Sequence, residues 1–312
     1  MNHQTHPNLS SIIAKRDPSR PARLIGMVHV GALPGTPFAS QSIEQIERQC
    51  VLEARQIEDA GFDAIIVENM HDAPYVHGDK LGPEIVAAMT RMTGAVRNAV
   101  GIPVGVQILS GGNRHAIGVA LTNGLPFIRC ENFVFAHVAD EGLLSEAEAG
   151  GLLRYRKSIG AEHVKVFCDI KKKHASHAIT HDIDLAEMAH AGEFFGADGF
   201  VVTGISTGKA AALEDVKAVR KATKLPVIVG SGVTPGYAAS LCEHADALIV
   251  GSSIKQDGFW KNPVDPERAS PSSMRSVPEV IACPIRPHNP TRASTSSLSV
   301  APPPRRGASS GA

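Results

Sequence analysis

Polar side chains that could carry acid–base chemistry recur along the chain, each near the end of a short apolar run. Six runs end this way, and their polar residues are His29, Glu68, Gln107, Arg129 with Glu131, Lys165 with Asp169, and Thr203. Carboxylates and amines can transfer protons, and an amine can also attack a carbonyl carbon to form a Schiff base. Exposure to water does not readily explain polar residues in six successive runs, because a charge that becomes buried is costly unless it is paired.

We expect three of these residues, Glu68, Lys165 and Asp169, to form the acid–base group. Lys165 lies four residues before Asp169 at the end of the same run, so it should lie deep among the strands. A salt bridge from Lys165 to Glu68, Glu131 or Asp169 is an equally good interpretation. The remaining polar residues are expected to bind substrate, and they are His29, Gln107, Arg129, Glu131 and Thr203.

Two later apolar runs end in small residues instead, as Gly-Ser-Gly and Gly-Ser-Ser. Glycine lets backbone N–H groups approach an anion closely, and serine adds hydroxyl donors. In barrel enzymes the loops after the last two strands commonly hold phosphate. The sequence therefore predicts a phosphate site formed by Gly230, Ser231, Gly232, Gly251, Ser252 and Ser253.

Two loops rich in histidine and acidic residues could instead supply the ligands of a metal site. Residues 68–84 contain Glu68, His71, Asp72, His77 and Asp79, and residues 169–184 contain Asp169, His174, His177, His181 and Asp182. Neither loop has a recognised metal-ligand spacing. We expect no cofactor, and a divalent metal is the less favoured alternative. The run Lys171–Lys173 could hold a second anionic group.

The elements that must position these residues are short apolar runs alternating with amphipathic stretches. The runs are 23–31, 64–69, 103–109, 126–132, 163–170, 199–204, 226–230 and 247–251. Apolar residues between them recur at helical spacing in 42–60, 83–100, 146–160, 185–195, 213–223 and 234–244. Strand–helix alternation indicates parallel strands, and eight strands favour an α/β fold of the closed (β/α)8 TIM-barrel type over a doubly wound sheet.

The end of the chain departs from this pattern. Asp265 and Pro266 predict the start of a final helix, but the residues that follow are rich in Pro, Ser and Arg and lack helical periodicity. We therefore expect a flexible arm over 1–21, a barrel domain over 22–268, and a disordered tail over 269–312 in place of a normal eighth helix. The tail is either a natural extension or the result of a reading-frame change near Ala269.

Composition excludes several classes of protein. The 31 basic and 31 acidic residues balance, which gives no reason to expect nucleic acid as a partner. Five scattered cysteines are typical of a reducing cytoplasm, and neither a secretory signal nor a membrane span is visible. We expect a cytoplasmic homo-oligomer whose partner is a phosphorylated small molecule, with peripheral membrane contact left open.

Five motifs give the chain a resemblance to a known family. They are "IGMVHVGALPGTP", "EDAGFDAIIVENMHDAPY", "VGVQIL", "IRCENFV" and "GSGVTPG", and from Arg23 to Arg268 the chain resembles the BtpA/SgcQ family. The resemblance implies a barrel of the ribulose-phosphate-binding type. One namesake is a peripheral thylakoid factor required to accumulate photosystem I, and the other is assigned as a nucleosidase encoded with sugar-uptake genes. The resemblance supplies no catalytic residues.

Three functions are compatible with the sequence. We favour an enzyme, of lyase, isomerase or nucleosidase-type hydrolase class, that acts on a phosphorylated sugar or nucleoside-like molecule. The alternative is a photosystem I biogenesis or stability factor without catalysis, which would be peripheral to the thylakoid. A pseudoenzyme that senses a phosphorylated metabolite is the third. Inward polar groups on six strands favour the enzyme, because an assembly factor would not need them.

Overall fold

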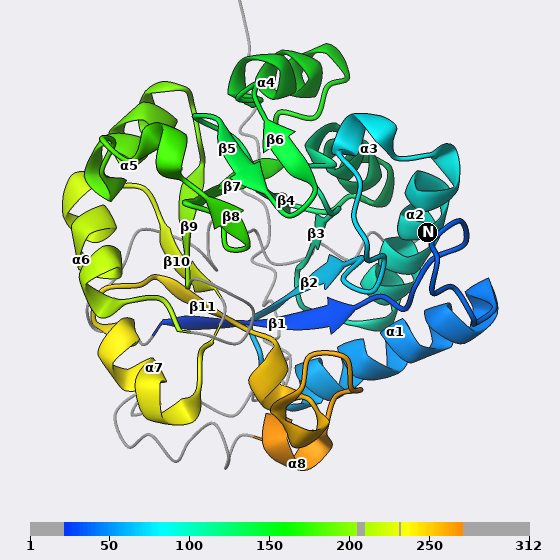
Figure 1. The fold of residues 1–312 in the computed structure, drawn as a ribbon. Coiled ribbons are helices and arrows are strands. Elements are labelled where there is room, and N and C mark those ends of the chain that lie inside the picture. Colours follow the sequence, from blue (N-terminus) through cyan, green and yellow to red (C-terminus); the bar gives the residue numbers. More distant parts are fainter. Residues whose placement is uncertain (1–21, 205–209, 231, 271–312) are drawn as a thin grey trace, which may run out of the picture.

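Eight parallel strands close into a barrel in the computed structural model, which describes residues 22–204, 210–230 and 232–270 (Figure 1). Around the barrel the strands follow the order β1-β11-β10-β9-β7-β4-β3-β2. Their bounds are β1 (Arg23–His29), β2 (Ala64–Glu68), β3 (Val104–Gln107), β4 (Phe127–Cys130), β7 (Lys165–Ile170), β9 (Gly199–Thr203), β10 (Val227–Gly230) and β11 (Ala247–Val250). Each corresponds to a predicted strand, which confirms the (β/α)8 prediction.

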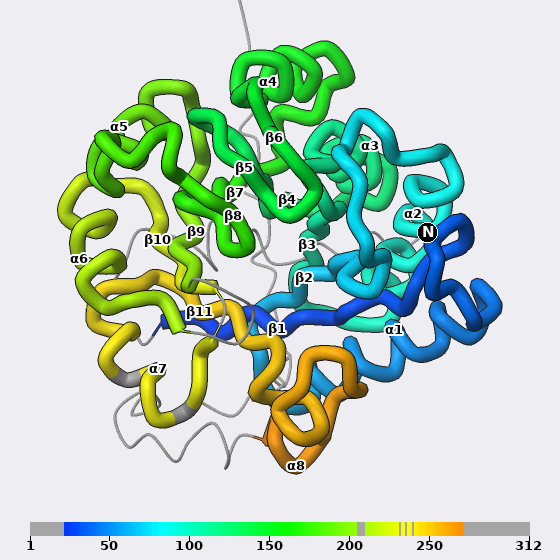
Figure 2. Tube along the Cα trace, viewed as in Figure 1, coloured from blue at the N-terminus to red at the C-terminus, as the bar shows by residue number. Residues whose placement is uncertain are grey.

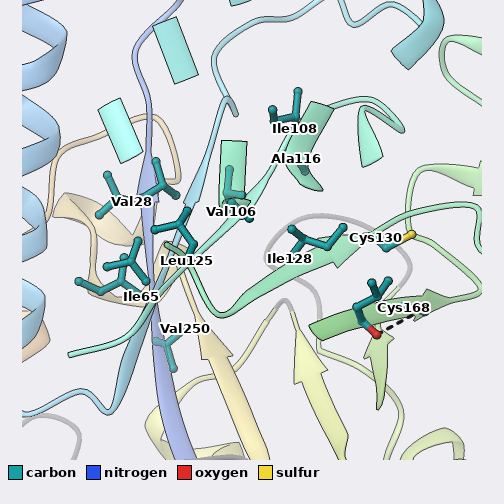
Figure 3. Packing of buried hydrophobic residues seen from close by; sticks show 14 of the residues in the cluster. Val28, Ile65, Val106, Ile108, Ala116, Leu125, Ile128, Cys130, Cys168 and Val250 are labelled. Carbon is teal, nitrogen blue, oxygen red and sulfur yellow. Dashed lines mark hydrogen bonds between the residues drawn. The ribbon is translucent and has the colours of Figure 1, made fainter. Parts of the chain in front are cut away.

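Alternation along the strands divides the core into two layers. Side chains such as Ile25, Ile66 and Ile249 fill the barrel interior, whereas Val28, Ile65, Val106 and Ile128 belong to the larger cluster between strands and helices (Figure 3).

Two phenylalanine rings fill much of the barrel interior. Phe127 and Phe167 lie edge to face with their centroids 5.6 Å apart. A Cβ atom at Gly105 of β3 would lie only 2.3 Å from the Phe127 ring, so glycine at this position makes room for it. The interior below the mouth is therefore a packed core rather than a channel.

Helices cover the outer face of the strands (Figure 1). They are α1 (Ile43–Asp59), α2 (Pro83–Ala99), α3 (Asn113–Asn123), α4 (Ala149–Ser158), α5 (Leu185–Phe194), α6 (Leu213–Ala222) and α7 (Pro235–Cys242). Ser42 begins α1 with a reciprocal capping box to Gln45, and Asp184 caps α5. Six of these helices correspond to predicted amphipathic stretches, whereas α3 does not. Within the described residues, no helix is long and apolar enough to cross a membrane.

A second, three-stranded sheet is formed by the loops that follow β4 and β7 (Figure 2). Strand β5 (His137–Ala139) pairs antiparallel with β6 (Gly142–Leu144) and with β8 (Ala175–Ser176). The sequence does not predict this sheet, because each strand is only two or three residues long. Its β5–β6 turn contributes Glu141 to the site described below.

The last described segment closes the barrel wall beside α1. Two short 3-10 turns, Ser252–Ile254 and Gln256–Gly258, precede α8 (Pro266–Ala269), which lies next to α1 in Figure 2. The Asp265 carboxylate accepts hydrogen bonds from the backbone N–H groups of Glu267 and Arg268, which confirms the predicted cap. The fully buried Lys255 donates to Glu53 of α1 at 2.6 Å. The predicted arm over 1–21 and tail beyond Ser270 lie outside the described residues.

Candidate active site

The register of the first three strands places three of the predicted polar residues in one row. His29 at the end of β1 lies opposite Glu68 at the end of β2, and Glu68 lies opposite Gln107 at the end of β3. All three are at the carboxyl-terminal mouth of the barrel, where the loops of such folds carry chemistry. Glu68 and Gln107 are buried, with 4% and 2% of their surface exposed.

Glu68 and His29 form a buried acid–base couple. Burial raises the pKa of Glu68, although the charges of Lys173 and Arg129 act in the opposite direction. Burial, followed by the charge of Lys255, lowers the pKa of His29, so its imidazole is neutral near pH 7. His29 Nδ1 lies 3.0 Å from the Trp260 carbonyl oxygen and must therefore donate to it. The unprotonated Nε2 lies 3.9 Å from Glu68 Oε2, so proton transfer between the two groups would need a bridging water or a small side-chain shift.

Arg129 and Asp169 form a buried, bidentate ion pair at the ends of β4 and β7. Arg129 Nε and Nη2 donate to the two carboxylate oxygens at 2.8 and 2.9 Å. Burial acts to lower the pKa of Arg129, but Asp169 outweighs it and raises that pKa. Asp169, predicted to be a proton carrier, instead has both oxygens committed to orienting the guanidinium, whose Nη1 remains for a ligand.

Lys165, predicted to be deep and catalytic, is neither buried nor at the mouth. Its side chain is 49% exposed, and its ammonium donates to Asp198 at 2.8 Å. Lys165 shares the inward parity of Phe167 and Asp169, but it is the first residue of β7. Four residues of strand span about 13 Å, so it lies at the amino-terminal end of the barrel, away from the site. The prediction that Lys165 is deeply buried was wrong, because alternation along a strand shows which face a residue is on but not how far along the barrel axis it lies.

Lys173 supplies the amine at the mouth that Lys165 does not. It follows β7 in a loop where Lys171 and His174 adopt left-handed backbone conformations, with φ of 47° and 55°. Such conformations are costly for residues other than glycine and are found where the surrounding structure enforces them. Burial, followed by the charge of Arg129, lowers the pKa of Lys173. Its ammonium forms no hydrogen bond or ion pair with the part of the chain that the structure describes.

Lys172, the residue before Lys173, belongs to a network in which its charge is paired with carboxylates. Its ammonium donates to Glu141 at 2.9 Å and lies 3.3 Å from Glu131. Burial would lower the pKa of Lys172, but the two carboxylates outweigh it and raise the pKa. The Ser110 hydroxyl donates to Glu141, and the Gly111 N–H donates to Glu131 at 3.0 Å. Glu131, predicted to bind substrate, thus lines the site and pairs with Lys172.

Within the described residues, two adjoining cavities open at the mouth. The small cavity, of about 190 Å³, is lined by residues of the last strand ends, among them Gly232, Gly251, Ser252 and Ser253. The guanidinium groups of Arg129 and Arg268 and the amine of Lys173 also line it. Of the six predicted phosphate ligands, four therefore border one cavity. Gly230 does not line this cavity, although an added Cβ there would be 3.8 Å from Arg129 Nη2, and Ser231 lies outside the described residues.

The large cavity, of about 430 Å³, lies over β2, β3 and β4 and is lined by aromatic and polar side chains, including Tyr75, Gln107, Glu131 and Trp260. Gln107 Oε1 is buried there and has no hydrogen-bond partner among the described residues. A buried acceptor of this kind is costly unless a ligand or water donates to it. Glu68, Met70 and Lys173 line both cavities, so they stand at the junction. Thr203 lines neither of these two cavities, and its hydroxyl donates to the Lys171 carbonyl at 3.4 Å.

The residues of the two candidate metal loops are separated by the fold. Asp72 accepts from the Leu33 N–H at 2.8 Å, and His77 Nε2 donates to the Glu141 carbonyl oxygen at 3.1 Å. The His177 ring lies tilted against the His137 ring, with the centroids 5.4 Å apart. No cluster of three or more His, Cys, Asp or Glu side chains suited to a metal occurs in residues 22–204, 210–230 and 232–270.

Sequence comparison identifies the lineage of this barrel. The profile of the BtpA family matches residues 20–276. The chain belongs to the BtpA family. An uncharacterized mitochondrial protein of Caenorhabditis elegans is 46% identical over 257 residues, which cover 81% of this chain and 91% of the relative. A photosystem I biogenesis protein BtpA of Synechocystis is 33% identical over 248 residues, covering 79% of this chain and 85% of that protein.

Comparison with solved structures supports the fold alone. The thiamine phosphate pyrophosphorylase of Pyrococcus furiosus superposes with a TM-score of 0.51, covering 83% of this chain and 96% of that enzyme. The two sequences are 14% identical, so the likeness shows a shared TIM-type barrel and carries no residue role across.

Proposed function

We propose that this BtpA-family barrel is an enzyme acting on a phosphorylated small molecule. The observation that carries the proposal is the junction of the two cavities at Glu68 and Lys173. The small cavity offers close backbone, serine hydroxyls and cationic side chains, which suit a phosphate group. The large cavity offers aromatic walls and an unpaired acceptor, which suit the rest of a sugar-like or nucleoside-like molecule. The reacting centre would lie between them.

In this arrangement each charged side chain at the mouth has a distinct task. Arg129 is oriented by Asp169 and presents its remaining N–H groups to the phosphate. Arg268 donates to the Ser253 carbonyl at 3.2 Å and completes the cationic wall. Glu68 holds a proton more readily than an ordinary carboxylic acid and would donate it to the substrate, while the neutral His29 imidazole beside it would act as a base. Gln107 would accept a hydrogen bond from a substrate hydroxyl or amine.

Thermal melting with inorganic phosphate, sugar phosphates and nucleotides tests the phosphate site. Gly251 is the position to change, because it lines the small cavity and an added Cβ would meet only ordinary contacts at 3.4 Å or more. Gly251→Asp adds a negative charge to the small cavity, whereas Gly151→Asp adds the same charge to α4, where an added Cβ meets nothing within 4 Å. We expect phosphates to raise the melting temperature of the wild type and of Gly151→Asp, but not of Gly251→Asp.

The same experiment separates the enzyme from the photosystem assembly factor suggested by the name of the Synechocystis relative. A chain that melts cooperatively and responds to no phosphate would contradict a phosphate-binding enzyme and favour the assembly role.

A further inference from the structure

The amine of Lys173 occupies a position that proton transfer alone does not explain. It lines both cavities together with Glu68, so it faces whatever part of a ligand spans the junction. Its neighbours Lys171 and Lys172 differ from it. Lys172 is held by two carboxylates, and Lys171 lines neither of these cavities.

We propose that Lys173 forms a Schiff base with a carbonyl-bearing monophosphate whose phosphate occupies the small cavity. The inference rests on the proposed function and names its substrate class, an aldehyde or ketone phosphate. Three features of the mouth carry it: an amine without an ion-pair partner among the described residues, the guanidinium of Arg129 lining the same small cavity, and a carboxyl group at the same junction. An amine in a desolvated site near a second cation is the setting in which lysines become nucleophiles.

The chemistry uses groups already at the junction. The neutral Nζ lone pair adds to the carbonyl carbon while the carbonyl oxygen takes a proton from the Glu68 carboxylic acid. The ammonium formed returns one proton to Glu68, which passes it to the new hydroxyl group. The C–O bond then breaks, water leaves, and the nitrogen lone pair completes an iminium beside a Glu68 carboxylate, so that charge and protons balance. Lowering of the Lys173 pKa and raising of the Glu68 pKa both favour the forms required at the start.

Reductive trapping tests the inference on the full chain. Dihydroxyacetone phosphate and glyceraldehyde phosphate are added with sodium borohydride, which delivers hydride to the iminium carbon and fixes a secondary amine. We expect the protein to gain the mass of the probe less one oxygen, and peptide mapping to locate the adduct at Lys173. Inorganic phosphate should suppress the labelling, and dihydroxyacetone without phosphate should label weakly.

Two variants provide the matched comparison. Lys173→Arg keeps a long basic side chain but has no neutral lone pair, so labelling should fall at least about tenfold. Lys165→Arg changes an exposed lysine at the other end of β7 and should label as the wild type does. Because mapping on the wild type locates the adduct independently, a folding defect in Lys173→Arg would not obscure the result.

Labelling spread over exposed lysines, or unchanged in Lys173→Arg, would overturn the Schiff base. Absence of an adduct while phosphates still raise the melting temperature would overturn it as well and leave the phosphate-binding enzyme standing. Absence of both effects would contradict both proposals.

Discussion

Strand β7 carries a lysine at its amino-terminal end and another just beyond its carboxyl-terminal end, in opposite settings. At the first end, Lys165 is half-exposed and pairs with Asp198, which also accepts from Arg156 at 2.8 Å. At the other end, Lys173 lines two cavities near charged groups and has no such partner in the described part of the chain. A lysine is thus ion-paired at the amino-terminal end of β7, whereas the lysine beyond the carboxyl-terminal end is positioned to contact a ligand.

The carboxylates at the two ends differ in the same way. Asp198 is partly exposed and also accepts from the Val166 N–H, so it ties the start of β7 to the start of β9. Asp169 has only 2% of its side chain exposed and holds Arg129 at the mouth. Water screens charges at the amino-terminal end, whereas burial at the mouth makes each charge depend on its neighbours. Pairs of similar geometry should therefore differ in energy, and that difference can be measured.

Asp169→Asn should show the largest effect. An amide presents only one acceptor oxygen and no charge, so Arg129 would remain buried without its counter-ion. Breaking a buried pair in this way costs about 3–5 kcal/mol. Urea denaturation at fixed pH would measure the loss, and Asp198→Asn is the matched variant at the other end of the barrel. Equal losses for the two variants would contradict the contrast between the two ends.

Glu68→Gln should have an effect that depends on pH. The pKa of Glu68 in the folded chain is raised above its ordinary value of 4.5, so in the interval above that value the folded state binds more protons than the unfolded state. The free energy of unfolding of the wild type must then fall as pH rises through this interval. Glutamine does not titrate, so the variant should gain stability relative to the wild type from about pH 4.5 upward.

Melting curves between acidic and neutral pH would measure this gain. Glu187→Gln, which removes the same charge from an exposed position in the first turn of α5, is the matched control and should run parallel to the wild type. A Glu68→Gln variant that loses stability as pH rises would show that Glu68 is held ionised by its neighbours, and would remove it as a proton donor.

The sequence predicts the strands and their faces well because both depend on local physics. Apolar runs specify the barrel strands, which are four to seven residues long, and alternation places His29, Glu68 and Gln107 on the inner face. Small residues after the last two strands also lie together, because the carboxyl ends of parallel strands meet at one mouth.

What the sequence does not reveal depends on contacts between distant segments. Alternation could not distinguish Lys165 from a residue at the mouth, because every second residue of a strand, from its first to its last, lies on the same face. The position of Lys173 depends on a turn with two left-handed residues, Lys171 and His174, which no composition rule predicts. Glu141 enters the site only because β5 and β6 form a hairpin over the mouth.

Lys165→Met should have the smallest effect and most directly tests the contrast between the ends of β7. Exposed ion pairs contribute about 0–1 kcal/mol, because water already solvates both groups and screens their attraction. Asp198 would keep its bonds to Arg156 and to the Val166 N–H, so no buried charge is left alone. Urea denaturation should show a loss within that range, and phosphate should stabilise the variant as it does the wild type. A loss as large as that of Asp169→Asn, or a weakened phosphate response, would mean that the amino-terminal end of β7 acts on the mouth after all.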